Sequence, residues 1–148
     1  MPAGSAAALI CDTGALIDYL VASAPDHGAF RRAIDQARTR YVPGLVLAEL
    51  DYFLRDERRA MRVFMHDLAK GAFTYAPPTA GQLARAMDVD ARFADLGLGL
   101  VDGSVVALAE SLGVRRLATR DVRQFAAVRL HDGRAFDLVV RPTTPERS

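Results

Sequence analysis

Residues 7–14 have the sequence Ala-Ala-Leu-Ile-Cys-Asp-Thr-Gly, an apolar run that stops abruptly at an acid and a turn. Five consecutive apolar residues are too continuous for a half-exposed strand and too few for a core helix. The run therefore predicts a buried parallel strand over residues 7–11. Asp12 would stand at the carboxyl end of this strand, where a carboxylate is costly unless its charge is compensated.

The remainder of the chain alternates between helical and strand patterns. Apolar residues recur at helical spacing in six segments, at 15–20, 26–37, 43–54, 61–68, 79–93 and 101–112. Strand-like runs occur at 41–42, 73–75, 116–119 and 136–140, and residues 96–100 are expected to form a loop. This alternation favours an α/β fold, a three-layer α/β/α sandwich with a central, mainly parallel sheet. We expect one domain over residues 1–141 and a polar tail over residues 142–148.

Composition narrows the class of protein. A chain of 148 residues that is 51% hydrophobic and 25% charged is typical of one soluble globular domain. The net charge of +1 indicates no polyanionic partner by itself, so contact with nucleic acid would need a local basic patch. A single cysteine excludes an intramolecular disulfide and the usual Cys-based zinc sites. No signal-peptide pattern or apolar run of roughly 20 residues is present, so we expect a cytoplasmic protein without membrane contact.

Four acids, Asp12, Glu49, Asp102 and Asp121, interrupt stretches that are otherwise apolar. Asp12 and Asp121 follow predicted strands, at the edge where parallel sheets form their active sites. Glu49 lies on the apolar face of its predicted helix. Asp102, in the first turn of another predicted helix, likewise shares a face with apolar residues. Each acid alone could be a turn, cap or ion-paired residue, but capping does not explain Glu49. We expect the fold to gather all four in one pocket, where Mg²⁺ or Mn²⁺ would offset their repulsion.

The segments around these acids resemble the motifs of PIN-domain nucleases, and more narrowly of VapC-type toxins from bacterial type II toxin–antitoxin pairs. The resemblance covers nearly the whole chain in the right order, through residues 9–16, 42–50, 98–109 and 117–125. It implies a PIN-like nuclease domain over residues 1–141. Gly14 and Gly103 depart from the family pattern, in which Ser or Asn and Ala, respectively, are common.

The resemblance implies a metal-dependent endoribonuclease that hydrolyses RNA phosphodiester bonds as the toxin of such a pair. Asp12 and Asp102 would contact Mg²⁺ or Mn²⁺ directly or through water, and Asp121 would contact the same ion or its water shell. Glu49 would hold a second ion or orient the attacking water.

Several nearby side chains are candidates for supporting roles. Thr13 and Thr119 could donate hydroxyls to the waters of the metal or to the scissile phosphate, and Ser104 is a weaker candidate. Arg120 and Arg123 flank the fourth acid and are the best placed arginines for binding RNA phosphates. The acids at positions 18, 51 and 95 are expected on the surface, because helical spacing does not force them inward.

The resemblance also implies two protein partners, a cognate antitoxin and a second copy of the chain in a homodimer. An antitoxin peptide would lie across the early helices, in a groove that needs exposed apolar side chains. The candidates for this groove, several of which suit the core equally well, are Leu16, Tyr19, Tyr52, Phe53, Phe64 and Met65.

Three other functions are compatible with some of these sequence features. The Asp12-Thr13-Gly14 turn also matches aspartic proteases, whose fold is nearly all strand, whereas this chain is mainly helical in pattern. A PIN relative that only binds protein or RNA would be expected to have lost an acid, and all four are present. An RNA-processing nuclease that is not a toxin would have the same site, so this alternative stays open.

Overall fold

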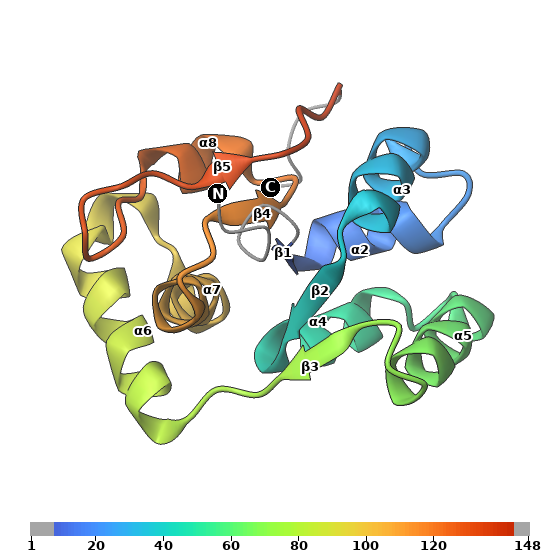
Figure 1. The fold of residues 1–148 in the computed structure, drawn as a ribbon, viewed down its shortest axis with the longest axis horizontal. Helices are drawn as coiled ribbons and strands as arrows, with labels where there is room; N and C mark the ends of the chain where they lie inside the picture. Colours follow the sequence, from blue (N-terminus) through green and yellow to red (C-terminus); the bar gives the residue numbers. More distant parts are fainter. Residues whose placement is uncertain (1–7, 144–148) are drawn as a thin grey trace.

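A computed structural model describes residues 8–143, and a parallel sheet runs through its middle (Figure 1). The five strands are ordered β3-β2-β1-β4-β5. Their bounds are β1 (Ala8–Cys11), β2 (Thr39–Pro43), β3 (Thr74–Ala76), β4 (Arg116–Ala118) and β5 (Asp137–Leu138). Residue 7 of the first predicted strand and residues 144–148 of the predicted tail lie outside the described part.

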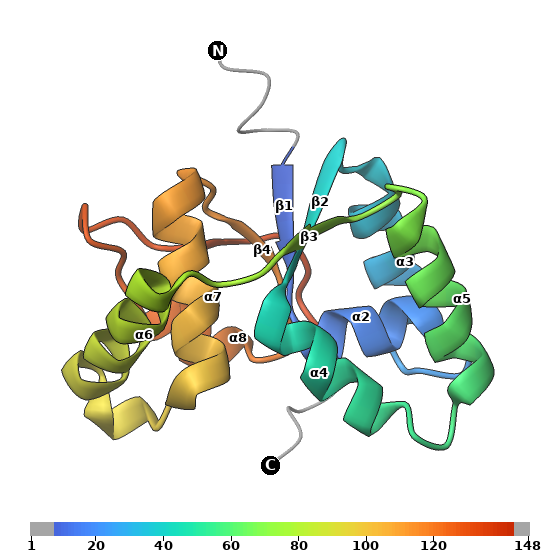
Figure 2. The same ribbon diagram turned by 90° about the horizontal axis from the view of Figure 1, so that it is seen from below.

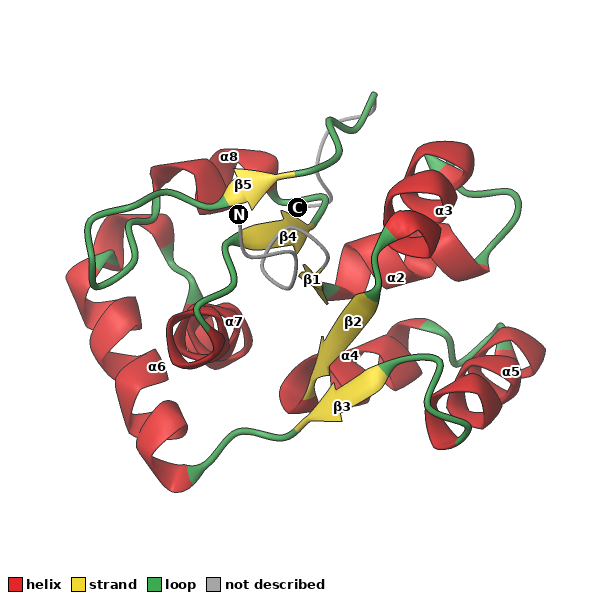
Figure 3. Ribbon diagram, viewed as in Figure 1, coloured by secondary structure: helices red, strands yellow, loops and turns green. Residues whose placement is uncertain are grey.

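Helices cover both faces of this sheet. They are α2 (Thr13–Leu20), α3 (His27–Gln36), α4 (Gly44–Phe53), α5 (Arg58–Ala69), α6 (Ala80–Arg92), α7 (Gly99–Leu112) and α8 (Val122–Ala127), with a 3₁₀ turn η1 (Ala94–Leu96). Helices α6 and α7 lie on one side of the strands, and α3 and α5 lie on the other (Figure 2). The strands therefore form the middle layer between two groups of helices (Figure 3). The predicted three-layer α/β/α sandwich is confirmed.

Strand β1 forms the centre of the core, because it pairs with β2 on one side and β4 on the other. Leu9, Ile10 and Cys11 are fully buried, as their uninterrupted apolar run predicted. Burying one such aliphatic side chain stabilises the fold by about 1.5–3 kcal/mol. None of the described helices has the length and apolar character needed to cross a membrane.

The strand order reverses next to β1. The chain builds β1, β2 and β3 outward in one direction and then returns through α6 and α7 to place β4 on the other side of β1. The carboxyl ends of β1 and β4 thus meet at a topological switch point, where open parallel sheets bind their ligands. The backbone N–H of Asp12 donates to the carbonyl oxygen of Ala118 at 2.9 Å, which brings the residues after both strands together.

Some predicted boundaries were wrong for local reasons. Pro43 was expected in the first turn of a helix, but it ends β2, pairs with Ala76 and leaves Gly44 to begin α4. Gly99 was expected in a loop but begins α7 with a positive φ of 77°, a conformation that glycine adopts readily. Helix α8 was not predicted, because its six residues are too few to show a helical period.

Gly103 explains how closely α6 and α7 approach each other. A Cβ atom at this position would lie 2.5 Å from the carbonyl oxygen of Ala86 in α6, closer than van der Waals contact allows. The family's more common alanine therefore does not fit here unless the two helices separate. Because Asp102 is the preceding residue, this contact also fixes one wall of the predicted site.

We expect Gly103→Ala to destabilise the protein by about 1–3 kcal/mol, as overpacking in a close helix contact does. Gly81→Ala in α6 is the matched control, because its Cβ would meet only the Thr79 hydroxyl, at 3.8 Å. That substitution should stabilise the helix by about 0.5–1 kcal/mol through the lower entropy of the unfolded chain. Urea denaturation of both variants measures the difference, and equal effects would contradict the close contact.

Candidate active site

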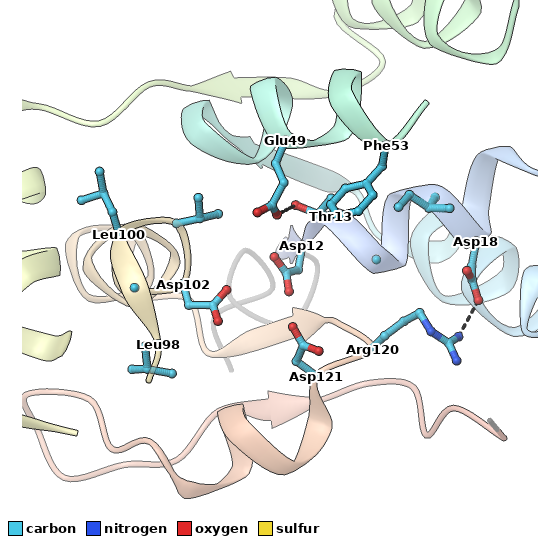
Figure 4. A pocket seen from close by; sticks show the side chains of 14 residues that line it. Asp12, Thr13, Asp18, Glu49, Phe53, Leu98, Leu100, Asp102, Arg120 and Asp121 are labelled. Atoms are coloured by element: carbon cyan, nitrogen blue, oxygen red, sulfur yellow. Dashed lines mark hydrogen bonds and ion pairs between the residues drawn. The ribbon is translucent and has the colours of Figure 1, made fainter. Parts of the chain in front are cut away.

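The four predicted acids line one cavity of about 330 Å³ at the carboxyl ends of β1 and β4. Asp12 follows β1, Glu49 comes from α4, Asp102 from the first turn of α7 and Asp121 from the start of α8 (Figure 4). The chain thus brings together side chains that are more than a hundred residues apart in sequence, as the spacing of the strands predicted.

Three of these acids form a tight group. Asp12, Asp102 and Asp121 each offer a carboxylate oxygen, and the three oxygens lie within 4.8 Å of one another. Glu49 lines the same cavity but stands outside this group. Its Oε1 accepts a hydrogen bond from the Thr13 hydroxyl at 2.5 Å, so the middle of α4 and the start of α2 are joined beside the three acids.

Burial and mutual repulsion disfavour the charged forms of two carboxyls. Burial raises the pKa of Asp102 to about 8, and the negative charges of Asp12, Asp121 and Glu49 add to the effect. Burial also raises the pKa of Asp12 to about 6, although hydrogen bonds from Thr119 and the backbone of Thr13 oppose the rise. Shifts of this kind are typical of sites that bind a cation or transfer protons.

The Thr119 hydroxyl links two of the acids. It donates to Oδ2 of Asp12 at 2.8 Å and accepts from the backbone N–H of Asp121 at 3.0 Å. This single hydroxyl therefore orients the carboxylate after β1 and the backbone after β4. Ser104 differs, since its buried hydroxyl donates to the Val101 carbonyl oxygen at 2.6 Å within its own helix.

Arg120, expected as an RNA-binding residue, lines the cavity, but its guanidinium is held by two acids. Its Nη1 lies 2.5 Å from Oδ2 of Asp18 and 2.9 Å from Oδ2 of Asp26, and the side chain is only 8% exposed. In Figure 4 the guanidinium points toward Asp18 and away from the group of acids. Asp26 in turn accepts hydrogen bonds from the backbone N–H and hydroxyl of Thr143. Arg120 therefore joins α2, the start of α3 and the end of the described chain.

Asp18 was expected on the surface, but it is 1% exposed. It interrupts the apolar residues of α2, the same signal that singled out Glu49, so the sequence did contain the information. Gly14 belongs to the same arrangement, because a Cβ there would lie 3.1 Å from the stem of Arg120. The family's larger residue at this position would compete with Arg120 for space.

Two further side chains hold the start of α7, and no sequence pattern predicted them. Oδ1 of Asp90 accepts from the backbone N–H of Gly99 at 2.8 Å, and the Gln124 side-chain amide donates to the Leu96 carbonyl oxygen at 2.8 Å. Together they fix the turn that precedes Asp102. The groove residues predicted for an antitoxin divide into two groups: Leu16, Tyr19 and Phe64 are buried in the core, whereas Tyr52, Phe53 and Met65 are exposed.

This fold and this group of acids define a class of protein. The sequence pattern of the PIN domain matches residues 9–130, and the chain belongs to the PIN-domain family. The chain is also 34% identical, over 134 residues, to a protein of Mycobacterium tuberculosis named Ribonuclease VapC26. That match covers 88% of this chain and 99% of the relative.

Solved structures share the fold at lower sequence identity. The crystal structure of Mycobacterium tuberculosis VapC20, described as a Sarcin-Ricin loop cleaving toxin, matches with a TM-score of 0.68 at 19% identity, over 80% of this chain and 94% of the other. A toxin-antitoxin complex from Klebsiella pneumoniae matches with a TM-score of 0.64 at 18% identity, over 81% of this chain and 92% of that one. These likenesses support the three-layer fold.

We expect Arg120→Ala to lower the free energy of unfolding by about 3–5 kcal/mol, because it leaves the buried carboxylates of Asp18 and Asp26 without its guanidinium. Arg38→Ala, which removes an exposed guanidinium, serves as the control and should change stability by less than about 0.5 kcal/mol. Denaturant unfolding measures both. Equal stability of the two variants would contradict the structural role of Arg120.

The raised pKa values predict how stability depends on pH in the metal-free protein. The folded state binds more protons than the unfolded chain between the ordinary carboxyl pKa of about 4 and the folded pKa of Asp102, about 8. The contribution of these carboxyls to the free energy of unfolding should therefore be most favourable below about pH 4. It should decrease as the pH rises from about 4 to about 8. Asp102→Asn removes the charge, so it should raise the melting temperature at pH 8 by several degrees and flatten the dependence on pH. Calorimetry in the presence of a chelator tests this, and a variant less stable than the wild type at pH 8 would contradict it.

Proposed function

We propose that this protein is a divalent-metal-dependent endoribonuclease and the toxin of a toxin–antitoxin pair. The observation that carries the proposal is the group of three carboxylate oxygens within 4.8 Å of one another at the switch point of the sheet. Membership of the PIN family and 34% identity to a protein named a ribonuclease support RNA as the substrate. Such an enzyme would act in the cytoplasm.

The donor set fits Mg²⁺ or Mn²⁺. Asp12, Asp102 and Asp121 would hold the ion through hard carboxylate oxygens, which both metals prefer. The raised pKa of Asp102 fits a site in which a cation replaces a proton. When bound, a divalent ion lowers the pKa of a water molecule and offsets the negative charge that develops at a phosphodiester.

The chain's own residues would prepare this chemistry by holding oxygens in place. Thr119 keeps the Asp12 carboxylate oriented through its 2.8 Å hydrogen bond. Thr13 does the same for Glu49, which would orient the attacking water or hold a second ion. Ser104 is not retained as a supporting residue, because its hydroxyl is engaged within α7.

RNA phosphates would be bound by Arg123 rather than by Arg120. Arg123 is exposed in the first turn of α8, two residues after Asp121, whereas Arg120 is buried. A guanidinium near the acids would position the RNA backbone without reading its sequence. The protein would also bind a cognate antitoxin and form a homodimer. The toxin–antitoxin complex that shares this fold supports the antitoxin as a partner.

Two alternatives are less well supported. A binding-only relative would have no use for carboxyls whose repulsion costs stability, yet the group of acids is intact. An RNA-processing nuclease that is not a toxin would share the site, so the distinction rests on the toxin relatives. Growth arrest on expression, relieved by a protein encoded in the adjacent gene, would separate the two.

We expect Asp12→Asn to reduce kcat/KM for RNA cleavage by at least about 100-fold while the protein stays folded, because it removes a charged oxygen donor. Asp51→Asn, which alters an exposed acid on α4, should leave cleavage unchanged. Mapping new RNA 5′ ends after expression of each variant identifies the cleavage sites. The same ends should appear with purified wild-type protein in Mn²⁺ or Mg²⁺ and disappear in excess chelator. Cleavage that survives chelation or Asp12→Asn would contradict the proposal.

A further inference from the structure

The cavity that holds the acids also has apolar walls. Phe53 from α4 and Leu100 from the start of α7 line it, and they lie on opposite sides of the carboxylates (Figure 4). Both side chains are well exposed, at 45% and 42%. Exposed apolar side chains beside a group of polar residues indicate a binding surface, because a ligand with a flat apolar group would remove them from water.

The position of Phe53 follows from the helix that carries it. Phe53 comes four residues after Glu49, so both side chains project from the same face of α4 into the cavity. Val46 and Leu50, on the adjoining part of this face, are fully buried in the core. The acid and the aromatic ring are thus presented together to whatever occupies the cavity.

Tyr52 offers a useful contrast on the same helix. It is more exposed than Phe53, at 61%, but it does not line the cavity. One side of its ring is covered by the guanidinium of Arg55, which lies 4.3 Å from the ring centroid, and the ring packs edge-on against Phe53 with the two centroids 5.6 Å apart. Exposure of an aromatic ring on α4 therefore does not by itself place it at the site, and Phe53 is distinguished by its direction.

We propose that Phe53 stacks on the nucleobase next to the scissile phosphate and so positions the RNA over the acids. This inference rests on the proposed function and adds a substrate-positioning residue to it. A phosphate held over the three acids through a cation carries a sugar and base on each side. The base on the α4 side then meets the only aromatic ring among the residues that line the cavity in the described part of the chain.

The size of the cavity and the energetics of stacking favour an unpaired base. Its volume of about 330 Å³ is at the lower end for small-molecule pockets, which suits one nucleotide rather than a segment of duplex. A base in a duplex is already paired and stacked on its neighbours, so it would have to leave the helix before it could reach Phe53. Any base can stack on an aromatic ring. Phe53 would therefore favour an unpaired base over a paired one, with little preference for its identity.

The first test uses a single-stranded RNA whose cleavage site has been mapped with the wild-type enzyme. Phe53→Leu keeps an apolar side chain but removes the ring, and we expect kcat/KM to fall by about 5- to 150-fold. Phe53→Tyr should retain most of the activity. Tyr75→Leu removes an exposed ring on β3 that does not line the cavity, so it is the matched control and should change little. A matched duplex containing the same site should be a poor substrate for the wild type.

An abasic nucleotide separates stacking from other roles of the ring. Removing the base on the affected side of the scissile phosphate should slow the wild type about as much as Phe53→Leu does, and should slow Phe53→Leu no further. If Phe53→Leu loses as much activity on the abasic RNA as on the intact RNA, its effect does not pass through the base and the proposal is wrong.

Binding provides a readout that does not depend on turnover. In an Asp12→Asn background, RNA carrying 2-aminopurine at the same position should lose fluorescence on binding, because stacking quenches this base. Adding Phe53→Leu should abolish the quenching, and adding Tyr75→Leu should not. Quenching that persists without Phe53, or wild-type cleavage that Phe53→Leu leaves unchanged, would overturn the inference. A wild-type enzyme that cleaves no RNA in Mn²⁺ or Mg²⁺ would instead overturn the proposed function itself.

Discussion

Repulsion among carboxyls that the backbone holds together is the constraint on which this structure depends. Asp12 and Asp121 follow two neighbouring parallel strands, and the hydrogen bond from Asp12 to the Ala118 carbonyl oxygen fixes the spacing of those strands. Asp102 is fixed by α7, which packs too closely on α6 to move away. The acids cannot relieve their repulsion by separating, so only a proton or a cation can do so. Burial is the larger cause of the raised pKa values of Asp12 and Asp102, and the repulsion between the acids adds to it.

The surrounding residues keep the acids oriented while the cavity stays accessible. Thr119 and Thr13 each give a hydroxyl hydrogen to one acid, which orders the carboxylates without neutralising them. Arg120 directs its guanidinium to Asp18 of α2 and to Asp26, which precedes α3, and away from the group of acids. That buried cluster stabilises the segment next to the acids. The aliphatic part of the Arg120 side chain packs against Gly14, where a larger residue would leave it less room.

The sequence predicted the fold and the four acids well, because both follow from topology. A continuous apolar strand is expected in the buried centre of a parallel sheet, and an acid directly after it lies at the carboxyl edge. The carboxyl ends of adjacent parallel strands lie at this same edge, so acids that follow them come together. Side-chain direction in loops was less predictable: Arg120 and Arg123 both neighbour Asp121, yet one is buried and the other is exposed. Asp18 interrupts the apolar residues of α2 as Glu49 interrupts those of α4, so its burial was predictable, but its pairing with Arg120 was not. Helix α8 is too short to show a helical period, and the turn before α7 depends on side-chain contacts of Asp90 and Gln124 that no local pattern encodes.

The central claim is that the buried acids exchange a proton for a divalent cation. Calorimetric titration of the metal-free protein with Mn²⁺ at pH 7, in buffers of different ionisation enthalpy, measures how many protons are released on binding. With the pKa of Asp102 at about 8, the account predicts release of close to one proton per bound ion, and much less from Asp102→Asn. Binding of Mn²⁺ without proton release, or no binding at all, would contradict it.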